Sequence, residues 1–119
     1  MGRYYSGDIE GKFWFGLQSS DAADRFGVEG EPPAELQYFF SEDDLEGVEE
    51  EIQSIEESLG EKKQILDDFF KEGRGYTDQD IEALGVSKDE LSEYADLLLG
   101  IKIRDQIRDF GECNFTAEL

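Results

Sequence analysis

Residues 41–72 have the sequence SEDDLEGVEEEIQSIEESLGEKKQILDDFFKE. Apolar residues recur along this stretch at alternating steps of three and four positions, and Lys62 stands at the one missing step. Because an α-helix turns once every 3.6 residues, this spacing places them on one stripe of a helix. The stripe consists of Leu45, Val48, Ile52, Ile55, Leu59, Leu66 and Phe69. The pattern predicts a single long helix that buries this stripe, with Gly60 as a candidate kink.

The positions outside the stripe are strongly acidic. Thirteen carboxylates in this stretch face three lysines, so it carries a net charge of −10, half of the chain's formal charge of −20. Like charges four positions apart on a helix, such as Glu42 and Glu46, destabilise it by about 0.2–0.5 kcal/mol per pair. The density of one-signed charge therefore exceeds what a solvated helix face needs.

The composition indicates a folded chain. Strong negative charge is often a sign of disorder, but 38% of the residues are hydrophobic and 13% are aromatic, which favours a packed core. The length of 119 residues is that of one ordinary domain. We expect a single acidic domain over residues 1–119.

Three segments alternate in the manner of β-strands: Lys12–Gln18, Glu35–Phe40 and Cys113–Leu119. The first two are close enough in sequence to pair antiparallel. We expect residues 19–26 between them to form one or two helical turns that end at Gly27. Tyr4 and Tyr5 are ambiguous, because the glycines that follow them favour a turn.

Three capping boxes mark helix starts. They pair Ser41 with Asp44, Thr77 with Asp80, and Ser87 with Glu90, and they begin the helices expected over 41–72, 76–85 and 88–110. The last of these is apolar on more than one face, which predicts contact with the sheet on one side and with the 41–72 helix on the other. The fold class is therefore α+β: an antiparallel sheet of about three strands with helices on one face, in the order β-β-α-α-α-β.

The chain contains no histidine and a single cysteine, Cys113. Most nucleophile–base pairs and nitrogen- or sulfur-rich metal sites are thereby excluded, and Cys113 falls on the apolar face of the last strand, where core packing is expected. A carboxylate enzyme with a divalent ion around Asp8 and Glu10 remains as a third hypothesis. Asp78, Asp80 and Glu82 start like a calcium loop, but Ala83 replaces the required glycine and a helix start is favoured. We expect no cofactor.

The charge also selects partners. Nucleic acid and anionic membranes would be repelled, whereas a basic protein surface is the natural complement. The sequence lacks the pattern of a signal peptide and has no apolar run long enough to cross a bilayer, so we expect a cytoplasmic protein, or one in the host cytoplasm if the source is viral.

The leading hypothesis is a non-enzymatic acidic binding module that mimics nucleic acid and blocks a basic nucleic-acid-binding protein. Its charge and size, though not its sequence, are those of small inhibitors carried by phages, including some anti-CRISPR and anti-restriction proteins. The candidate partner-binding residues are Glu42, Asp43, Glu46, Glu49, Glu50, Glu56 and Glu57. The alternative is a structural module that forms a homodimer through the stripe from Leu45 to Phe69. Solubility or a halophilic origin would also explain the acidity.

Overall fold

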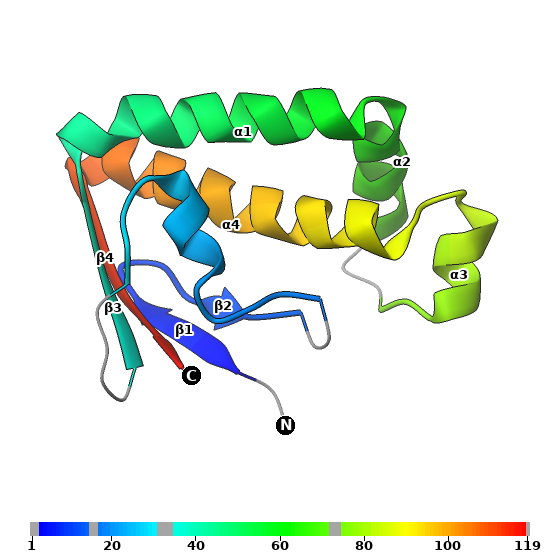
Figure 1. Cartoon of the computed structure of the whole chain (residues 1–119), viewed down its shortest axis with the longest axis horizontal. Coiled ribbons are helices and arrows are strands. Elements are labelled where there is room, and N and C mark those ends of the chain that lie inside the picture. Colours follow the sequence, from blue (N-terminus) through cyan, green and yellow to red (C-terminus); the bar gives the residue numbers. More distant parts are fainter. Residues whose placement is uncertain (1–2, 15–16, 31–34, 72–74, 119) are drawn as a thin grey trace.

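The structure is a computed structural model that describes residues 3–14, 17–30, 35–71 and 75–118. An antiparallel sheet forms one side of the molecule, and helices α1 and α4 lie together along its other side (Figure 1). The strands are β1 (Tyr4–Gly7), β2 (Gly11–Lys12), β3 (Glu35–Ser41) and β4 (Glu112–Glu118). The helices are the 3-10 turns η1 (Ala22–Phe26) and η2 (Glu42–Asp44) and the α-helices α1 (Leu45–Leu59), α2 (Glu61–Phe70), α3 (Asp78–Ala83) and α4 (Lys88–Phe110). The α+β fold class is confirmed.

The four strands of the sheet lie in the order β2-β1-β4-β3, and every neighbouring pair is antiparallel. The last strand of the chain therefore lies between β1 and β3. This position agrees with its alternation, because Cys113, Phe115 and Ala117 are buried and stand on the helix side of the sheet. Leu119, the end of the predicted strand, lies outside the described residues. The expected strands at 35–40 and 113–118 are confirmed.

The predicted strand Lys12–Gln18 is wrong beyond Lys12, and this segment does not pair with β3. The N–H groups of Leu17 and Gln18 both donate to the Trp14 carbonyl, and the Trp14 N–H donates to the Gln18 side chain. These local bonds compete with a sheet ladder and fold the chain into a turn. Residues 15–16 lie outside the described part of the chain. The sheet instead takes β1, which includes Tyr4 and Tyr5.

The prediction of a single long helix over 41–72 is also wrong, because the helix is interrupted at Gly60. Gly60 has φ 54° and ψ −127°, a conformation that residues with a side chain rarely adopt. Helix α2 consequently leaves α1 at a steep angle (Figure 1). Lys62 stands just after the break, where its ammonium donates to the Gly85 carbonyl and lies 3.8 Å from the Glu90 carboxylate. Residues 72–74, including Glu72, lie outside the described part of the chain.

Helix α4 is the centre of the fold and runs without a break through Gly100. It contacts α1 on one side and β4 on the other, as its apolar pattern predicted. A methyl group at Gly100 would lie 2.4 Å from the Phe26 ring, so glycine is needed there for η1 to pack closely. The capping boxes at Ser87 and Thr77 are formed as expected.

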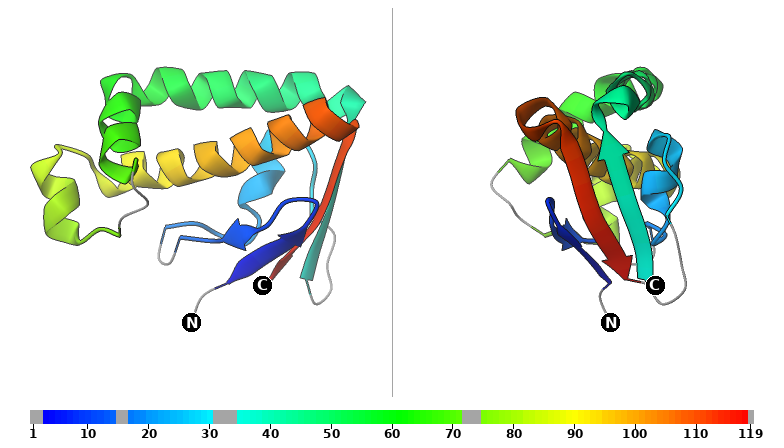
Figure 2. Two further views of the ribbon diagram at one scale, coloured as in Figure 1. Left: turned by 180° about the vertical axis from the view of Figure 1, so that it is seen from behind. Right: turned by 90° about the vertical axis from the view of Figure 1, so that its left-hand side faces the viewer.

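The two faces of the sheet differ in chemistry. On the helix side, the Phe115 ring stacks on Tyr38 with 4.9 Å between ring centroids. On the other side, Gln37, Phe39 and Thr116 face outward, and none of the described helices covers them (Figure 2). Within the described parts of the chain, no helix combines the length and apolar composition needed to cross a bilayer.

Candidate functional site

The predicted binding residues lie on η2 and α1, whose orientation is set by the apolar stripe. Val48, Ile52, Ile55 and Leu59 are buried in the chain's own core. Because these residues point inward, the opposite side of α1 faces solvent. The stripe proposed for a homodimer is thus already used within one chain as far as Leu59, and Leu66 of α2 is buried too.

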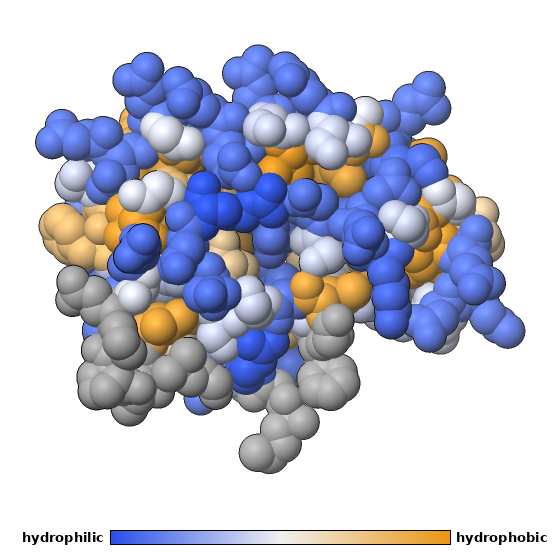
Figure 3. Space-filling model, viewed as in Figure 1, coloured by the Kyte–Doolittle hydropathy of each residue, from blue (hydrophilic) through white to orange (hydrophobic). Residues whose placement is uncertain are grey.

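Five of the seven predicted residues are exposed and make no salt bridge to any residue that the structure describes. We call them the outer acidic face: Glu42, Asp43, Glu46, Glu50 and Glu57. Hydrophilic side chains follow α1 along the top of the molecule in the view of Figure 3. The structure therefore brings these five carboxylates onto one uncompensated surface.

The other two predicted residues, Glu49 and Glu56, are half-buried and have basic neighbours. Their spacing of seven positions puts them on one flank of α1. Glu49 is bonded to Arg108 of α4, and Glu56 lies 4.0 Å from the Lys63 ammonium. Partly compensated carboxylates attract a cationic partner less strongly than free ones, so these two residues are set apart from the outer acidic face.

The 3-10 turn η2, which leads directly into α1, is capped by the predicted residues. The Ser41 N–H donates to the Asp44 carboxylate at 2.9 Å, which satisfies one donor at the helix start. Glu42 and Asp43 follow at the end of the helix where the macrodipole favours negative charge, by about 0.3–1 kcal/mol each. Local structure therefore stabilises two of the five exposed carboxylates where they stand.

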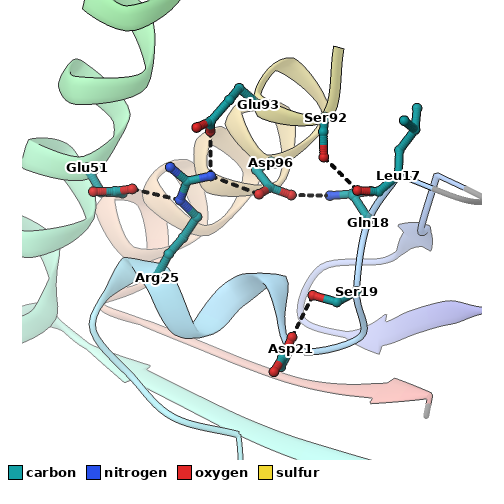
Figure 4. A network of polar contacts seen from close by, with 9 residues as sticks. All are labelled: Leu17, Gln18, Ser19, Asp21, Arg25, Glu51, Ser92, Glu93 and Asp96. Carbon is teal, nitrogen blue, oxygen red and sulfur yellow. Dashed lines mark hydrogen bonds and ion pairs between the residues drawn. The ribbon is translucent and has the colours of Figure 1, made fainter. Parts of the chain in front are cut away.

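The opposite flank of α1 carries a polar network that sequence reasoning missed (Figure 4). The Arg25 guanidinium of η1 lies between α1 and α4. Its Nε donates to Glu51 at 2.7 Å, and its Nη1 donates to Glu93 at 2.6 Å and to Asp96 at 2.8 Å. Gln18 extends the network by donating to Asp96 at 2.9 Å. One cation thus joins three carboxylates from two helices; we call these four charged residues the Arg25 network.

Burial sets the electrostatics of this network. Burial disfavours the charged form of Arg25, but the hydrogen bonds that it donates to Glu93, Glu51 and Asp96 outweigh burial and hold its pKa above the ordinary value. Burial raises the pKa of the Asp96 carboxyl, and the hydrogen bonds from Gln18 and Arg25 only partly offset that rise. The network is therefore a half-buried structural tie, and its carboxylates are not available to a partner.

One signal in the sequence points to this tie. Arg25 is the only basic residue between Lys12 and Lys62, a stretch rich in acids. A lone cation in such surroundings is expected to collect carboxylates, because each would otherwise be partly buried without a counter-charge. The partners could not be named from the sequence, since Glu93 and Asp96 are about 70 positions away.

Asp8 and Glu10, the residues considered for a carboxylate enzyme, bond to different partners. The Asp8 carboxylate accepts hydrogen bonds from the backbone and side chain of Asn114, and the Glu10 carbonyl accepts one from Lys102. Over the described ranges, no group of three or more Cys, Asp or Glu side chains is arranged to hold a metal ion. Cys113 is fully buried, as predicted, and burial raises the pKa of its thiol to about 12, so the reactive thiolate is disfavoured.

Comparison with models of protein families, with curated proteins and with solved structures finds no match for this chain.

Proposed function

We propose that the protein is a non-enzymatic acidic binding module whose outer acidic face occupies the nucleic-acid-binding surface of a basic protein. The observation that carries this proposal is the separation of the acids of α1 into two kinds. Glu49, Glu51 and Glu56 have basic partners within the chain, whereas the five residues of the outer acidic face have none among the described residues. Charge left uncompensated on a rigid helix is available for a cationic partner.

The carboxylates of η2 and α1, taken together, approach the linear charge density of nucleic acid, and the outer acidic face contributes five of the nine. Nine carboxylates lie between Glu42 and Glu57, which spans about 23 Å at a helical rise of about 1.5 Å per residue. This corresponds to about one charge per 2.5 Å, compared with about one per 1.7 Å of axis in duplex DNA. A groove that binds phosphates through lysine and arginine would therefore meet a similar row of anions on α1.

The break at Gly60 limits the mimicking surface to η2 and α1. Helix α2 turns away and carries Lys62 and Lys63 at its start, so the row of anions does not continue past Leu59. A surface of this kind fits a small inhibitor of a nucleic-acid-handling protein. Anti-defence inhibitors of the phage type, such as anti-CRISPR or anti-restriction proteins, are the class that we propose, on charge and size alone.

The proposal is tested by capture from a lysate of the source organism at low and at high salt. The test variant replaces all five residues of the outer acidic face with their amides. The control replaces five exposed acids elsewhere with their amides, so that both variants have the same net charge. These five are Glu61, Asp68, Glu82, Asp89 and Asp109. We expect the wild type and the control to retain a basic protein at low salt and the test variant to lose it. Equal retention by both variants would contradict the proposal.

A further inference from the structure

The exposed aromatic side chains of the described residues lie on the sheet or directly beside it. Three large hydrophobic side chains are exposed among these residues: Tyr4, Phe39 and Phe110. Phe39, on the outer side of β3, is 56% exposed, and Phe110, the last residue of α4, is 72% exposed. The outer side of the sheet and the end of α4 both face the viewer in the right-hand view of Figure 2. Exposed apolar side chains that gather in one area mark contact surfaces, whereas single ones do not.

Phe39 and Phe110 lie close to one junction of the chain. Ser41, the last residue of β3, pairs with Glu112, the first residue of β4. Phe39 pairs with Asn114, so Phe39 and Glu112 are diagonal neighbours on the outer side of the sheet, about 7–8 Å apart. Phe110 precedes Glu112 by two positions. The two phenylalanines therefore flank the place where β3 leads into η2 and α4 leads into β4.

The structure of the chain does not require an aromatic side chain at position 110. Helix α4 ends because Gly111 adopts a left-handed conformation with φ 82°, and the Gly111 N–H donates to the Ile107 carbonyl at 2.7 Å. This cap is formed by backbone groups alone and leaves most of Phe110 in solvent. No ring–ring or cation–π contact joins Phe39 or Phe110 to another described residue. Both ring faces are thus open to a partner.

Two exposed carboxylates stand beside these rings. A Cβ atom placed on Gly111 would lie 2.9 Å from a carboxylate oxygen of Glu42, so the Glu42 side chain lies against the residue that follows Phe110. Glu112 is the next residue along the chain. Both acids are exposed and make no salt bridge to a described residue. We call these four residues the aromatic corner: Phe39, Phe110, Glu42 and Glu112.

The composition of the aromatic corner selects a cationic occupant with a flat face. The face of a phenyl ring attracts a cation that lies within about 6 Å of the ring centroid. Arginine suits such a corner better than lysine, because its guanidinium is planar, stacks on rings and donates to carboxylates as a fork. The nearby Arg108 of this chain is already bonded to Glu49 of α1. A second copy would bring another net charge of −20 and would be repelled at moderate salt.

We propose that the aromatic corner is a second contact area for the basic partner and receives arginine side chains of that partner. The guanidinium groups stack on the two phenyl rings and bond to the two carboxylates. The corner continues the outer acidic face around the end of α1, because Glu42 belongs to both. The inference rests on the proposed function for the basic character of the partner. It adds a contact that depends on the shape of the cation as well as on its charge.

Two short peptides of equal charge test this contact on the full-length protein. In the first, two arginines alternate with three glycines; in the second, lysines replace the arginines. Titration at low salt, followed by nuclear magnetic resonance, gives the affinity and the signals that shift. We expect the arginine peptide to bind about threefold more tightly and to shift the signals of Phe39 and Phe110. Equal affinities, no binding, or shifts confined to other surfaces would overturn the inference.

Replacement of the rings separates stacking from charge. The double change Phe39→Thr and Phe110→Gln removes both exposed rings and leaves the net charge unchanged. We expect it to keep the circular dichroism spectrum of the wild type and to bind the two peptides equally well. A preference for arginine that survives the double change would overturn the inference. If the double variant is misfolded, the comparison of the two peptides on the wild type still decides.

Tyr4→Thr is the matched control, because it removes the third exposed aromatic side chain away from the corner. The Lys12 ammonium of the chain already lies 5.9 Å from the centroid of the Tyr4 ring. We expect this variant to keep the full preference for the arginine peptide. Loss of the preference in this variant would place the contact at Tyr4 and would overturn the inference.

Capture of the partner from the lysate separates this inference from the proposed function. Loss of capture by the amide variant of the outer acidic face, with full retention by the double phenylalanine variant, overturns the inference alone. Weaker capture by the double phenylalanine variant, with capture unchanged by the amide variant, overturns the proposed function alone. Self-association at high salt that shifts the signals of Phe39 and Phe110 would make a second copy the occupant and would overturn the inference.

Discussion

Glu50 and Glu51 are neighbours in helix α1, yet they belong to surfaces with opposite roles. Glu50 is exposed and has no salt bridge to a described residue, whereas Glu51 is bonded to Arg25 at 2.7 Å. One position along a helix rotates the side chain by about 100°, which here separates the outer acidic face from the Arg25 network. A glutamate is thus a surface anion at position 50 and part of a tertiary contact at position 51.

The two surfaces differ in whether their carboxylates have a basic partner within the chain. In the Arg25 network, one guanidinium serves three carboxylates, and Asp96 is only 15% exposed, so attraction is little screened by solvent. On the outer acidic face, repulsion between neighbours is screened by water and salt. The network should therefore dominate the stability of the fold, and the outer acidic face should dominate its interactions.

Removal of the shared cation should have the largest effect on stability. We expect Arg25→Met to lower the free energy of unfolding by about 2–3 kcal/mol, because three carboxylates then face one another without a counter-charge. The value is below that of a fully buried pair, since the Arg25 side chain is 29% exposed. Urea denaturation measures it. Arg108→Met is the matched control, and its exposed pair with Glu49 should contribute less than about 1 kcal/mol.

The titration of Asp96 should make the stability of the Arg25 network depend on pH. Burial raises the pKa of this carboxyl in the folded state, so the folded chain binds the proton more tightly than the unfolded chain. The resulting stabilisation is fully present below the unfolded pKa of about 3.9 and is lost as pH rises through the folded pKa. Asparagine does not titrate.

We therefore expect the stability of the wild type relative to Asp96→Asn to fall as pH rises from about 3.9 through the raised folded-state pKa of Asp96. Urea denaturation of both proteins at several pH values measures the difference. A difference that grows with pH would mean that the ion pair with Arg25 outweighs burial at this carboxyl.

Neutralising charges on the outer acidic face should have a small effect of the opposite sign. We expect the triple change Glu46→Gln, Glu50→Gln and Glu57→Gln to raise the free energy of unfolding by about 0.5 kcal/mol at low salt, because repulsion between neighbours on α1 is relieved. The same denaturation experiment measures it. A clear loss of stability would show that these carboxylates support the fold.

Salt should produce the smallest effect. Added sodium chloride screens repulsion on the outer acidic face, so we expect the melting temperature of the wild type to rise with salt. The melting temperature of the triple amide variant should rise less with salt. If the melting temperatures of the two proteins depended on salt in the same way, the screened repulsion would lie elsewhere in the chain.

Local features of the sequence were reliable guides to the fold. The capping residues Ser87 and Thr77 mark the helix starts that the structure has, and the alternation in 113–118 matches β4. These patterns are set by neighbours within a few positions. The exposure of Glu46 and Glu50 followed in the same way from the apolar stripe opposite them.

Long-range contacts decided the features that the sequence did not predict. The turn at Trp14 depends on the Gln18 side chain, which is itself held by Asp96 of α4. The Arg25 network joins residues separated by up to 71 positions. The change of direction at Gly60 depends on where α2 packs. The helical spacing of the apolar residues continues across Gly60 and therefore does not reveal this change.

If the outer acidic face takes the place of nucleic acid, the chain and DNA should compete for the same surface of the partner. A basic protein captured by the wild-type chain is titrated with duplex DNA, and the fraction released is measured. We expect progressive release of the partner as DNA replaces the chain, with no ternary complex of the chain, the partner and DNA. Retention of the partner together with bound DNA would contradict the claim, because the chain would then occupy a different surface.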